Sequence, residues 1–421
     1  MKLKEQLVSK AKENLADIKK IRQTIHEYPE LAYNENNTAK LIADYLEKEN
    51  IYYERKNKFA KTGVLGIIKG RKTNNVGPVV ALRCDMDALK KHEISQCPYA
   101  SKIPGCMHAC GHDGHVAILL GAAKLISLLK NKFSGHVKFI FQPGEENGSG
   151  ALAMIKEGVL EYPKVEWMFA LHSWPYLPCG TIGIKENSIT SAASQFIIEI
   201  TGKSTHAAHL HKGVDPIVIA ADIINSIQKI CSRISSPIEP GVISITMIET
   251  GNKGCNTNGP PGSYPLLKGQ WNVIPDIVRL TGTTRAFTNE QQKLQLSQIK
   301  NMSQQIALMF GAKSEFYVKN TCPSTVNNME ATQMVKDVGI ELLGKDNVIP
   351  LKETSMGGED FSYYLQNTNI KGSYFRLGLA NKSCTSCPCL HSNCFDFNDD
   401  ALIPGMLVMA GTALKILRVK I

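Results

Sequence analysis

The chain has 421 residues, which is too long for one ordinary hydrophobic core and favours two domains. Its composition, 43% hydrophobic and 20% charged, is that of a globular protein and excludes collagen-like and low-complexity classes. The formal net charge of +10 comes mainly from scattered lysines, and no basic stripe alternates with aromatic residues, which argues against nucleic-acid binding.

The residues Met1–Leu7 are typical of a charged amphipathic helix start rather than of a signal peptide. No apolar stretch reaches the roughly 18 uncharged residues that a membrane span needs. Twelve cysteines in a chain of this kind are better explained as reduced thiols than as a disulfide framework. We therefore expect a cytoplasmic protein with neither a membrane nor a nucleic acid as partner.

Helical and strand patterns alternate over residues 1–187, as they do in α/β proteins. Helices are predicted at 4–20, 37–49, 116–130 and 151–157. Strands are predicted at 63–70, 78–83, 136–141 and 167–171. This order predicts an α/β domain.

The pattern changes after residue 187. The predicted order is strand (195–201), helix (215–230), strand (241–249), strand (277–287), helix (290–310) and strand (314–318). This βαββαβ order is typical of a four-stranded sheet with two helices on one face. The α/β pattern then resumes and ends in a helix at 401–417. We expect one domain made of residues 1–187 and 321–421, with residues 188–320 inserted into it as an α+β domain.

Three buried strand patterns each end in residue types that bind metals. They are followed by Asp85 and Asp87, by Glu145 and Glu146, and by His172. A fourth cluster, residues 107–115, reads MHACGHDGH and opens an apolar helix. Because the carboxyl ends of buried strands meet at the ligand crevice of α/β proteins, the first hypothesis is a hydrolytic metal site.

Cys110 and His112 lie two residues apart at the start of that helix. A thiolate and an imidazole are both good ligands for a borderline-soft divalent metal, and the helix dipole favours ionised sulfur. The alternative is a core cysteine beside a loop histidine.

The adjacent Glu145 and Glu146 point in different directions, so one can bind a metal while the other acts as a general base. Their alternative is a solvated surface pair. His172 and His391 are weak candidates by themselves, because a lone histidine is more often a satisfied core residue. Asp87 fits a carboxylate that orients a ligand imidazole. For Asp85, both that role and direct metal binding stay open.

Six segments carry a resemblance to a known family, in order from Ala81 to Phe397: ALRCDMDAL, MHACGHDGH, FQPGEE, LHSWP, NVIPD and LHSNCFDF. The chain resembles the aminoacylase and carboxypeptidase family of two-metal peptidases. Within it, the chain is similar to the amidohydrolase branch of hippurate hydrolases, N-acyl-amino-acid amidohydrolases and plant auxin-conjugate hydrolases.

The resemblance implies a mixed-sheet catalytic domain, an inserted lid and dimerisation domain, and two divalent metal ions, which we expect to be zinc, manganese or cobalt. It implies five metal ligands, namely Cys110, His112, Glu146, His172 and His391. Glu145 is the implied catalytic base, and His206 of the lid is implied to bind the substrate carbonyl oxygen. Asn272 and Arg285 match lid positions suited to a substrate carboxylate, although Arg285 could also be a solvated surface residue.

The expected reaction is metal-dependent hydrolysis of the amide bond in N-acyl amino acids of the hippurate kind, by a homodimer or higher oligomer formed through the lid. A dipeptidase or carboxypeptidase of the same fold is one alternative, with a dipeptide as the small-molecule substrate. A catalytically silent metal-binding scaffold is the other.

Four features depart from the family pattern: Lys90 in place of a usual proline, the segment 209–211 (HLH), an insertion at about 255–270, and four cysteines around His391, namely Cys384, Cys387, Cys389 and Cys394. The insertion could alter substrate access or the dimer contact. The cysteines fit either an additional zinc or redox site or reduced loop thiols.

Overall fold

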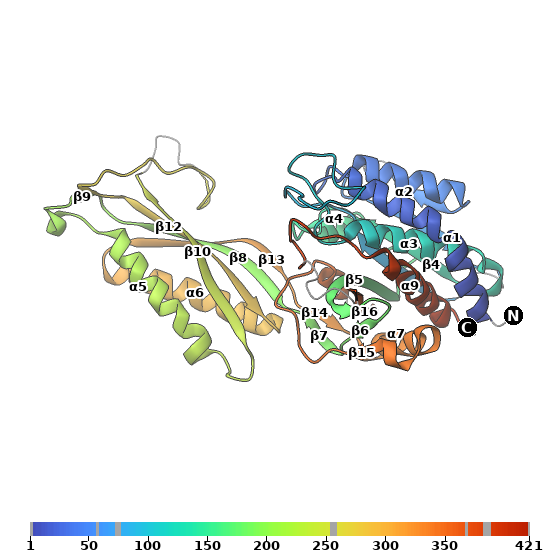
Figure 1. Cartoon of the computed structure of the whole chain (residues 1–421). Coiled ribbons are helices and arrows are strands. Elements are labelled where there is room, and N and C mark those ends of the chain that lie inside the picture. The colour runs from blue at the N-terminus through green and yellow to red at the C-terminus, as the bar shows by residue number, and fades with distance from the viewer. Residues whose placement is uncertain are drawn as a thin grey trace. The chain divides into compact units, whose positions relative to one another are not determined.

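The computed structural model (Figure 1) describes residues 3–55, 59–71, 77–252, 259–366, 369–381 and 389–419. The chain forms two compact units. Unit 1 comprises Met1–Ile189, Thr325–Glu353 and Asp360–Ile421. Unit 2 comprises Thr190–Ser324 and the short segment Thr354–Glu359, which is remote from the rest of unit 2 in sequence.

Unit 1 contains an eight-stranded sheet with the strand order β1-β2-β4-β3-β5-β16-β6-β15. Its strands are β1 (Tyr52–Glu54), β2 (Val64–Lys69), β3 (Val79–Asp85), β4 (His136–Gln142), β5 (Trp167–Pro178), β6 (Ile182–Ile184), β15 (Val348–Pro350) and β16 (Lys371–Ala380). The strands β4, β3, β5 and β16 run parallel to their neighbours in this series, whereas the β1/β2, β2/β4 and β6/β16 pairs are antiparallel. The predicted mixed sheet is therefore confirmed.

The helices of unit 1 are α1 (Leu3–Glu27), α2 (Asn36–Lys48), α3 (His112–Ser127), α4 (Gly150–Lys156), α7 (Met329–Leu343), α8 (Ser362–Leu365) and α9 (Leu402–Ile416). In α3, every residue except Lys124 and Ser127 is buried. A helix that is apolar all round is buried on all sides, and α3 accordingly contacts α1, α9 and strand β3.

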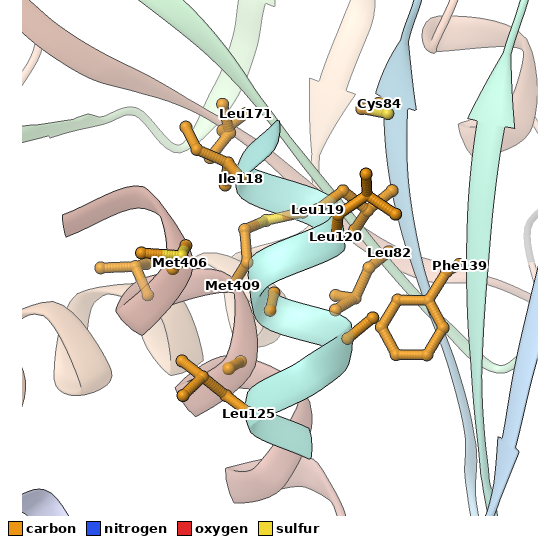
Figure 2. Packing of buried hydrophobic residues seen from close by; sticks show 14 of the residues in the cluster. Leu82, Cys84, Ile118, Leu119, Leu120, Leu125, Phe139, Leu171, Met406 and Met409 are labelled. Carbon is orange, nitrogen blue, oxygen red and sulfur yellow. The ribbon is translucent and has the colours of Figure 1, made fainter. Parts of the chain in front are cut away.

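The main core lies between α3 and the sheet. In Figure 2 the side chains of Leu119 and Leu120 point toward Leu82 of β3 and Phe139 of β4, and Met409 of α9 lies beside the same helix. Alternate residues of the same strands, such as Ala81 and Ile140, face a second apolar cluster on the opposite side of the sheet. Both faces of these strands are thus buried, which explains their continuous apolar sequences.

Unit 2 has the predicted order of elements: β8 (Ala192–Thr201), α5 (Pro216–Lys229), β10 (Gly241–Gly251), β12 (Ile277–Ala286), α6 (Asn289–Met309) and β13 (Lys313–Cys322). The four strands are antiparallel in the order β10-β12-β8-β13, and both helices lie on one face of the sheet (Figure 1). Two short strands, β9 (Thr205–His206) and β11 (Val273–Ile274), pair with each other. The strands β7 (Asn187–Thr190) and β14 (Thr325–Asn327) also form a two-stranded sheet.

The described part of the insertion, residues 259–270, is anchored on the sheet of unit 2. Arg279 Nη1 donates to the Tyr264 carbonyl oxygen at 3.2 Å, and the Tyr264 hydroxyl donates to the Glu199 carboxylate. Glu199 also pairs with Arg279 at 2.9 Å. Because Tyr264, Glu199 and Arg279 are buried, the segment is part of the packed unit. No helix in the described ranges is long and apolar enough to cross a membrane.

Candidate metal centre

Cys110 lies at the centre of a cluster of metal-binding side chains in unit 1. Its Sγ is 3.3 Å from His172 Nε2 and 3.3 Å from His391 Nε2. His391 Nε2 also lies 3.3 Å from Glu146 Oε1. Potential ligand atoms lie within 4.8 Å of one another in three overlapping groups: Cys110, His112 and His172; Cys110, Glu146 and His391; His112, Glu145 and Glu146. The five residues expected as ligands therefore lie together.

The strand ends explain only part of this arrangement. β3 ends at Asp85 and the parallel β4 ends at Gln142, so Asp87 and Glu145 follow neighbouring strand ends as predicted. We expected β5 to end before His172. Instead, β5 continues to Pro178. His391 lies in a loop with a φ of 61°.

Two imidazoles are oriented by backbone carbonyls, which can only accept hydrogen bonds. His112 Nδ1 donates to the Asp87 carbonyl oxygen at 2.9 Å, and His172 Nδ1 donates to the Ser173 carbonyl oxygen at 2.7 Å. In the neutral rings the proton is therefore on Nδ1, and Nε2 presents its lone pair to the cluster. Orientation of His112 by Asp87 thus involves the backbone carbonyl, since the Asp87 carboxylate is farther away, at 3.5 Å.

Asp85, whose role the sequence left open, holds neighbouring side chains. Its Oδ1 accepts from His115 Nδ1 at 2.6 Å, and its Oδ2 accepts from Arg83 Nη1 at 2.8 Å. His115 Nε2 in turn accepts from the Ser173 backbone N–H at 2.8 Å. His115 and Ser173 were not predicted as site residues, although His115 lies in the motif that marks the site.

The Asp87 carboxylate holds the turn that carries the two glutamates. Oδ1 accepts from the Glu145 N–H at 3.1 Å and Oδ2 accepts from the Glu146 N–H at 3.0 Å. Gly144, just before them, has a φ of 66°, and a Cβ there would come within 2.8 Å of the Tyr33 ring. Glycine thus lets this turn pass close to Tyr33.

The protonation equilibria reflect how crowded the cluster is. Burial raises the pKa of the Cys110 thiol. Hydrogen bonding to Cys110 and Glu146 raises the pKa of His391 to about 10. Burial opposes ionisation of Glu146, but His391 and His112 lower its pKa below the ordinary value. Positive charge is thus stabilised on His391 beside the thiol and the carboxylate, whereas burial lowers the pKa of His172 well below its ordinary value.

Two buried atoms of the cluster, His112 Nε2 and Glu146 Oε1, lack a hydrogen bond of good geometry within the described ranges, although Glu146 Oε1 lies 3.3 Å from His391 Nε2. Unpaired buried acceptors are costly, and a divalent cation would satisfy both. The mixed set of sulfur, imidazole and carboxylate donors suits a borderline metal better than Mg²⁺ or Ca²⁺. The residues therefore fit a metal centre.

The residues expected to bind substrate from the inserted domain all lie in unit 2. His206 of β9 is exposed, and its Nδ1 accepts from the Ala208 N–H at 3.1 Å. Asn272 lies beside it, with its carbonyl oxygen accepting from the Ala207 N–H at 2.9 Å. Arg285 lies near the far end of β12, half-buried, where it donates to the Thr284 carbonyl oxygen at 2.9 Å. The structure brings His206 and Asn272 together but not Arg285.

The structure describes some of the features that depart from the family pattern. Lys90 follows a short bridge that joins Leu89 to Met107. Cys389 and Cys394 are exposed free thiols, whereas Cys384 and Cys387 lie outside the described residues, so the predicted cysteine cluster is untested. The rings of His206, His209 and His211 follow one another with centroid distances of 5.7 and 6.2 Å.

Comparisons with known proteins agree with the chemistry of this site. Residues 81–415 match the family described as peptidase family M20/M25/M40. The chain is 36% identical to thermostable carboxypeptidase 1 of Saccharolobus solfataricus, covering 97% of this chain and 98% of the relative. It is also 36% identical to IAA-amino acid hydrolase ILR1-like 4 of Arabidopsis thaliana, covering 94% and 85%. A solved structure, the Bacillus subtilis YXEP protein described as a dinuclear metal binding peptidase from the M20 family, has 32% identity and a TM-score of 0.80, covering 97% and 99%.

Proposed function

The chain belongs to peptidase family M20/M25/M40, and from that premise we propose that it hydrolyses the amide bond of N-acyl amino acids. The products are a carboxylic acid and a free amino acid. Family membership confirms the predicted resemblance and makes the chain an amidohydrolase or peptidase. The observation that supports the proposal most is the pair Glu145 and Glu146, held side by side by Asp87 at the edge of the ligand cluster.

We assign metal binding to Cys110, His112, Glu146, His172 and His391. Two divalent ions are supported by the dinuclear centre of the YXEP protein, and the choice of zinc, manganese or cobalt is supported by the mixed donor set. When bound, two such ions would lower the pKa of a water molecule and polarise the amide carbonyl.

Glu145 is the proton carrier in this proposal. Asp87 holds the backbone of both glutamates, and Glu146 lies in the ligand cluster with its Oε1 3.3 Å from His391 Nε2, so the proton transfer is assigned to Glu145. Glu145 accepts a proton from the attacking water and then delivers a proton to the departing amine nitrogen. Both transfers use one carboxylate, so its position must serve two steps.

Unit 2 contributes substrate binding. His206 donates to the developing oxyanion, because its Nδ1 accepts from the Ala208 N–H, which leaves the proton of the neutral ring on Nε2. Asn272 and Arg285 hydrogen-bond the substrate carboxylate. In this proposal unit 2 acts as the lid of the site.

The spacing within unit 2 supports a dimer. His206 and Asn272 lie beyond the Ile277 end of β12, whereas Arg285 is eight residues further along that strand. Eight residues of strand span about 26 Å, which is longer than a small N-acyl amino acid. If both groups contact one substrate, they come from two copies of the chain. We therefore propose a homodimer, or a higher oligomer, formed through unit 2.

A carboxypeptidase or dipeptidase activity is the second candidate, favoured by the relative described as a thermostable carboxypeptidase. The deciding experiment is an assay of metal-reconstituted protein against N-acyl amino acids and dipeptides. We expect the highest kcat/KM for an N-acyl amino acid such as N-benzoylglycine. Faster hydrolysis of dipeptides would select the second candidate, and no hydrolysis of either class would leave the scaffold alternative.

A further inference from the structure

Arg376 is a buried arginine with an unusual environment. It lies in β16, and only 4% of its surface is exposed. Its guanidinium carbon is 4.1 Å from the centroid of the Trp174 ring and 5.2 Å from that of Tyr374. Such contacts stabilise a cation through its flat faces, but they use none of its N–H groups.

The other buried arginines of the described chain all have carboxylate partners. Arg22 pairs with Asp399 at 2.8 Å. Arg83 pairs with Asp360 at 2.9 Å, and Arg279 pairs with Glu199 at 2.9 Å.

Arg376 has neither a carboxylate nor any hydrogen-bond acceptor within the described ranges, although its five N–H donors are held in a largely buried position. A buried charge without a partner is costly, so such a group calls for an explanation. None of its nitrogens is among the fully enclosed atoms that lack a partner, so part of its N–H edge keeps a small contact with solvent.

Arg376 lies beside the metal centre. β16 runs parallel to β5, and Arg376 is in register with His172. Side chains alternate along strands, so Tyr374 and Arg376 share one face of the sheet with His172 and Trp174. The rings of His172 and Tyr374 have a centroid distance of 6.3 Å. The open guanidinium is thus one strand away from a residue whose Nε2 faces Cys110.

We propose that Arg376 binds a carboxylate group of the substrate. Two aromatic rings hold the flat guanidinium, so its edge is presented in a fixed orientation that suits the two oxygens of a carboxylate. This proposal rests on the proposed function for the identity of the reaction. The carboxylate comes either from the amino acid, in which case Arg376 takes the role proposed above for Asn272 and Arg285, or from the acyl group. Both sources present the same chemistry to Arg376.

The test measures binding rather than turnover, so that it is independent of the proposed function. The probe 3-benzoylpropanoate has a CH₂ group in place of the amide N–H of N-benzoylglycine and cannot be hydrolysed at that position. Its carboxamide lacks the charge. A third probe, 3-(4-carboxybenzoyl)propanamide, carries the charge on the acyl side. Calorimetric titration of the metal-loaded full chain gives the affinity for each probe.

We expect one of the two carboxylate probes to bind the wild-type protein roughly 10- to 100-fold more tightly than the neutral carboxamide, the scale of a charge-assisted hydrogen bond. Arg376→Gln should abolish that preference, and Arg376→Lys, which keeps the charge but loses the fork, should reduce it several-fold. The source of the carboxylate is identified by the carboxylate probe that no longer binds Arg376→Gln more tightly than the neutral carboxamide does.

The matched control is Lys371→Gln. Lys371 is a cation on the same strand, 5.0 Å from the Trp167 ring centroid, and it already has a partner in Glu330 at 2.6 Å. Its loss should leave the carboxylate preference unchanged. If the preference persists in Arg376→Gln and Arg376→Lys, or is absent from the wild-type protein, the proposal is wrong even if the chain hydrolyses N-acyl amino acids.

Discussion

The carboxylate of Glu35 accepts a hydrogen bond from the backbone N–H of Gly144, with 3.0 Å between Oε1 and the nitrogen. Its other oxygen accepts from the Thr62 hydroxyl at 2.6 Å. Since Asp87 binds the N–H groups of Glu145 and Glu146, three consecutive N–H groups of the proposed catalytic turn end on two buried carboxylates. Glu35 and Asp87 thus hold this turn in place, although neither residue contacts substrate or metal in the proposed mechanism.

Glu35 should make the stability of the fold depend on pH. Burial raises its pKa to about 7 from an ordinary 4.5, so the folded state binds the proton more tightly than the unfolded state. The free energy of unfolding should then fall as the pH rises from about 4.5 to about 7, by up to roughly 3 kcal/mol. Glu35→Gln removes this contribution and should be the more stable protein at pH 8. Urea unfolding of the wild-type protein and of Glu35→Gln at pH 5 and pH 8 checks this prediction. An equal pH dependence of the free energy of unfolding in both proteins would contradict it.

His26 should give a second dependence at higher pH. Its Nδ1 lies 2.9 Å from Asp113 Oδ2 and its Nε2 lies 3.2 Å from Glu93 Oε1. Burial opposes protonation, but these two carboxylates raise its pKa from 6.5 to about 9. The stabilisation is fully present below about pH 6.5 and is lost as the pH rises through 9. The wild-type protein should therefore lose stability relative to His26→Gln as the pH rises. The difference between their free energies of unfolding should shrink by about 3 kcal/mol between pH 6 and pH 10. A constant difference would show that the pKa of His26 is the same in the folded and unfolded states, and would contradict the prediction.

The sequence predicts those parts of the site that depend on strand ends. β3 and β4 are parallel neighbours, and the residues that follow them, Asp87 and Glu145, indeed lie together. The mixed sheet and the βαββαβ order also follow from apolar patterning, because buried strands and helices have distinct periods.

Side-chain contacts between residues far apart in the sequence could not be predicted from it. Arg83 looks like an interruption of an apolar strand, and its partner Asp360 is 277 residues away. His391 reaches Cys110 from a loop with no periodic pattern, and only the family motif indicated it. Arg376 is unremarkable in sequence, because the absence of a partner is a property of the folded environment.

The roles of the adjacent glutamates are separable by substitution. Glu145→Gln should retain metal but lose several orders of magnitude in kcat, because the amide does not accept the proton from water. Glu146→Gln should instead lower the bound metal, since Glu146 lies in the ligand cluster beside His391. Metal analysis and steady-state kinetics on both variants decide between them. The opposite pattern would exchange the two assignments.

The metal requirement has a direct test. Removal of divalent ions with a chelator should abolish amide hydrolysis, and Zn²⁺, Mn²⁺ or Co²⁺ should restore it whereas Mg²⁺ and Ca²⁺ should not. Cys110→Ser should bind less metal, because Cys110 contacts both His172 and His391. Full activity in protein shown by elemental analysis to be metal-free would end the two-metal hypothesis.

His206 tests whether unit 2 takes part in the chemistry. It is exposed and belongs to unit 2, yet we assign its Nε2–H to the oxyanion. His206→Ala should therefore lower kcat by roughly two to three orders of magnitude, the scale of losing one oxyanion donor, with metal content unchanged. His209→Ala is the matched control, because His209 lies on the same exposed loop with its ring centroid 5.7 Å from that of His206. Near-normal kcat in His206→Ala would leave unit 2 a structural role, whereas equal losses in both variants would indicate damage to the loop rather than loss of a donor.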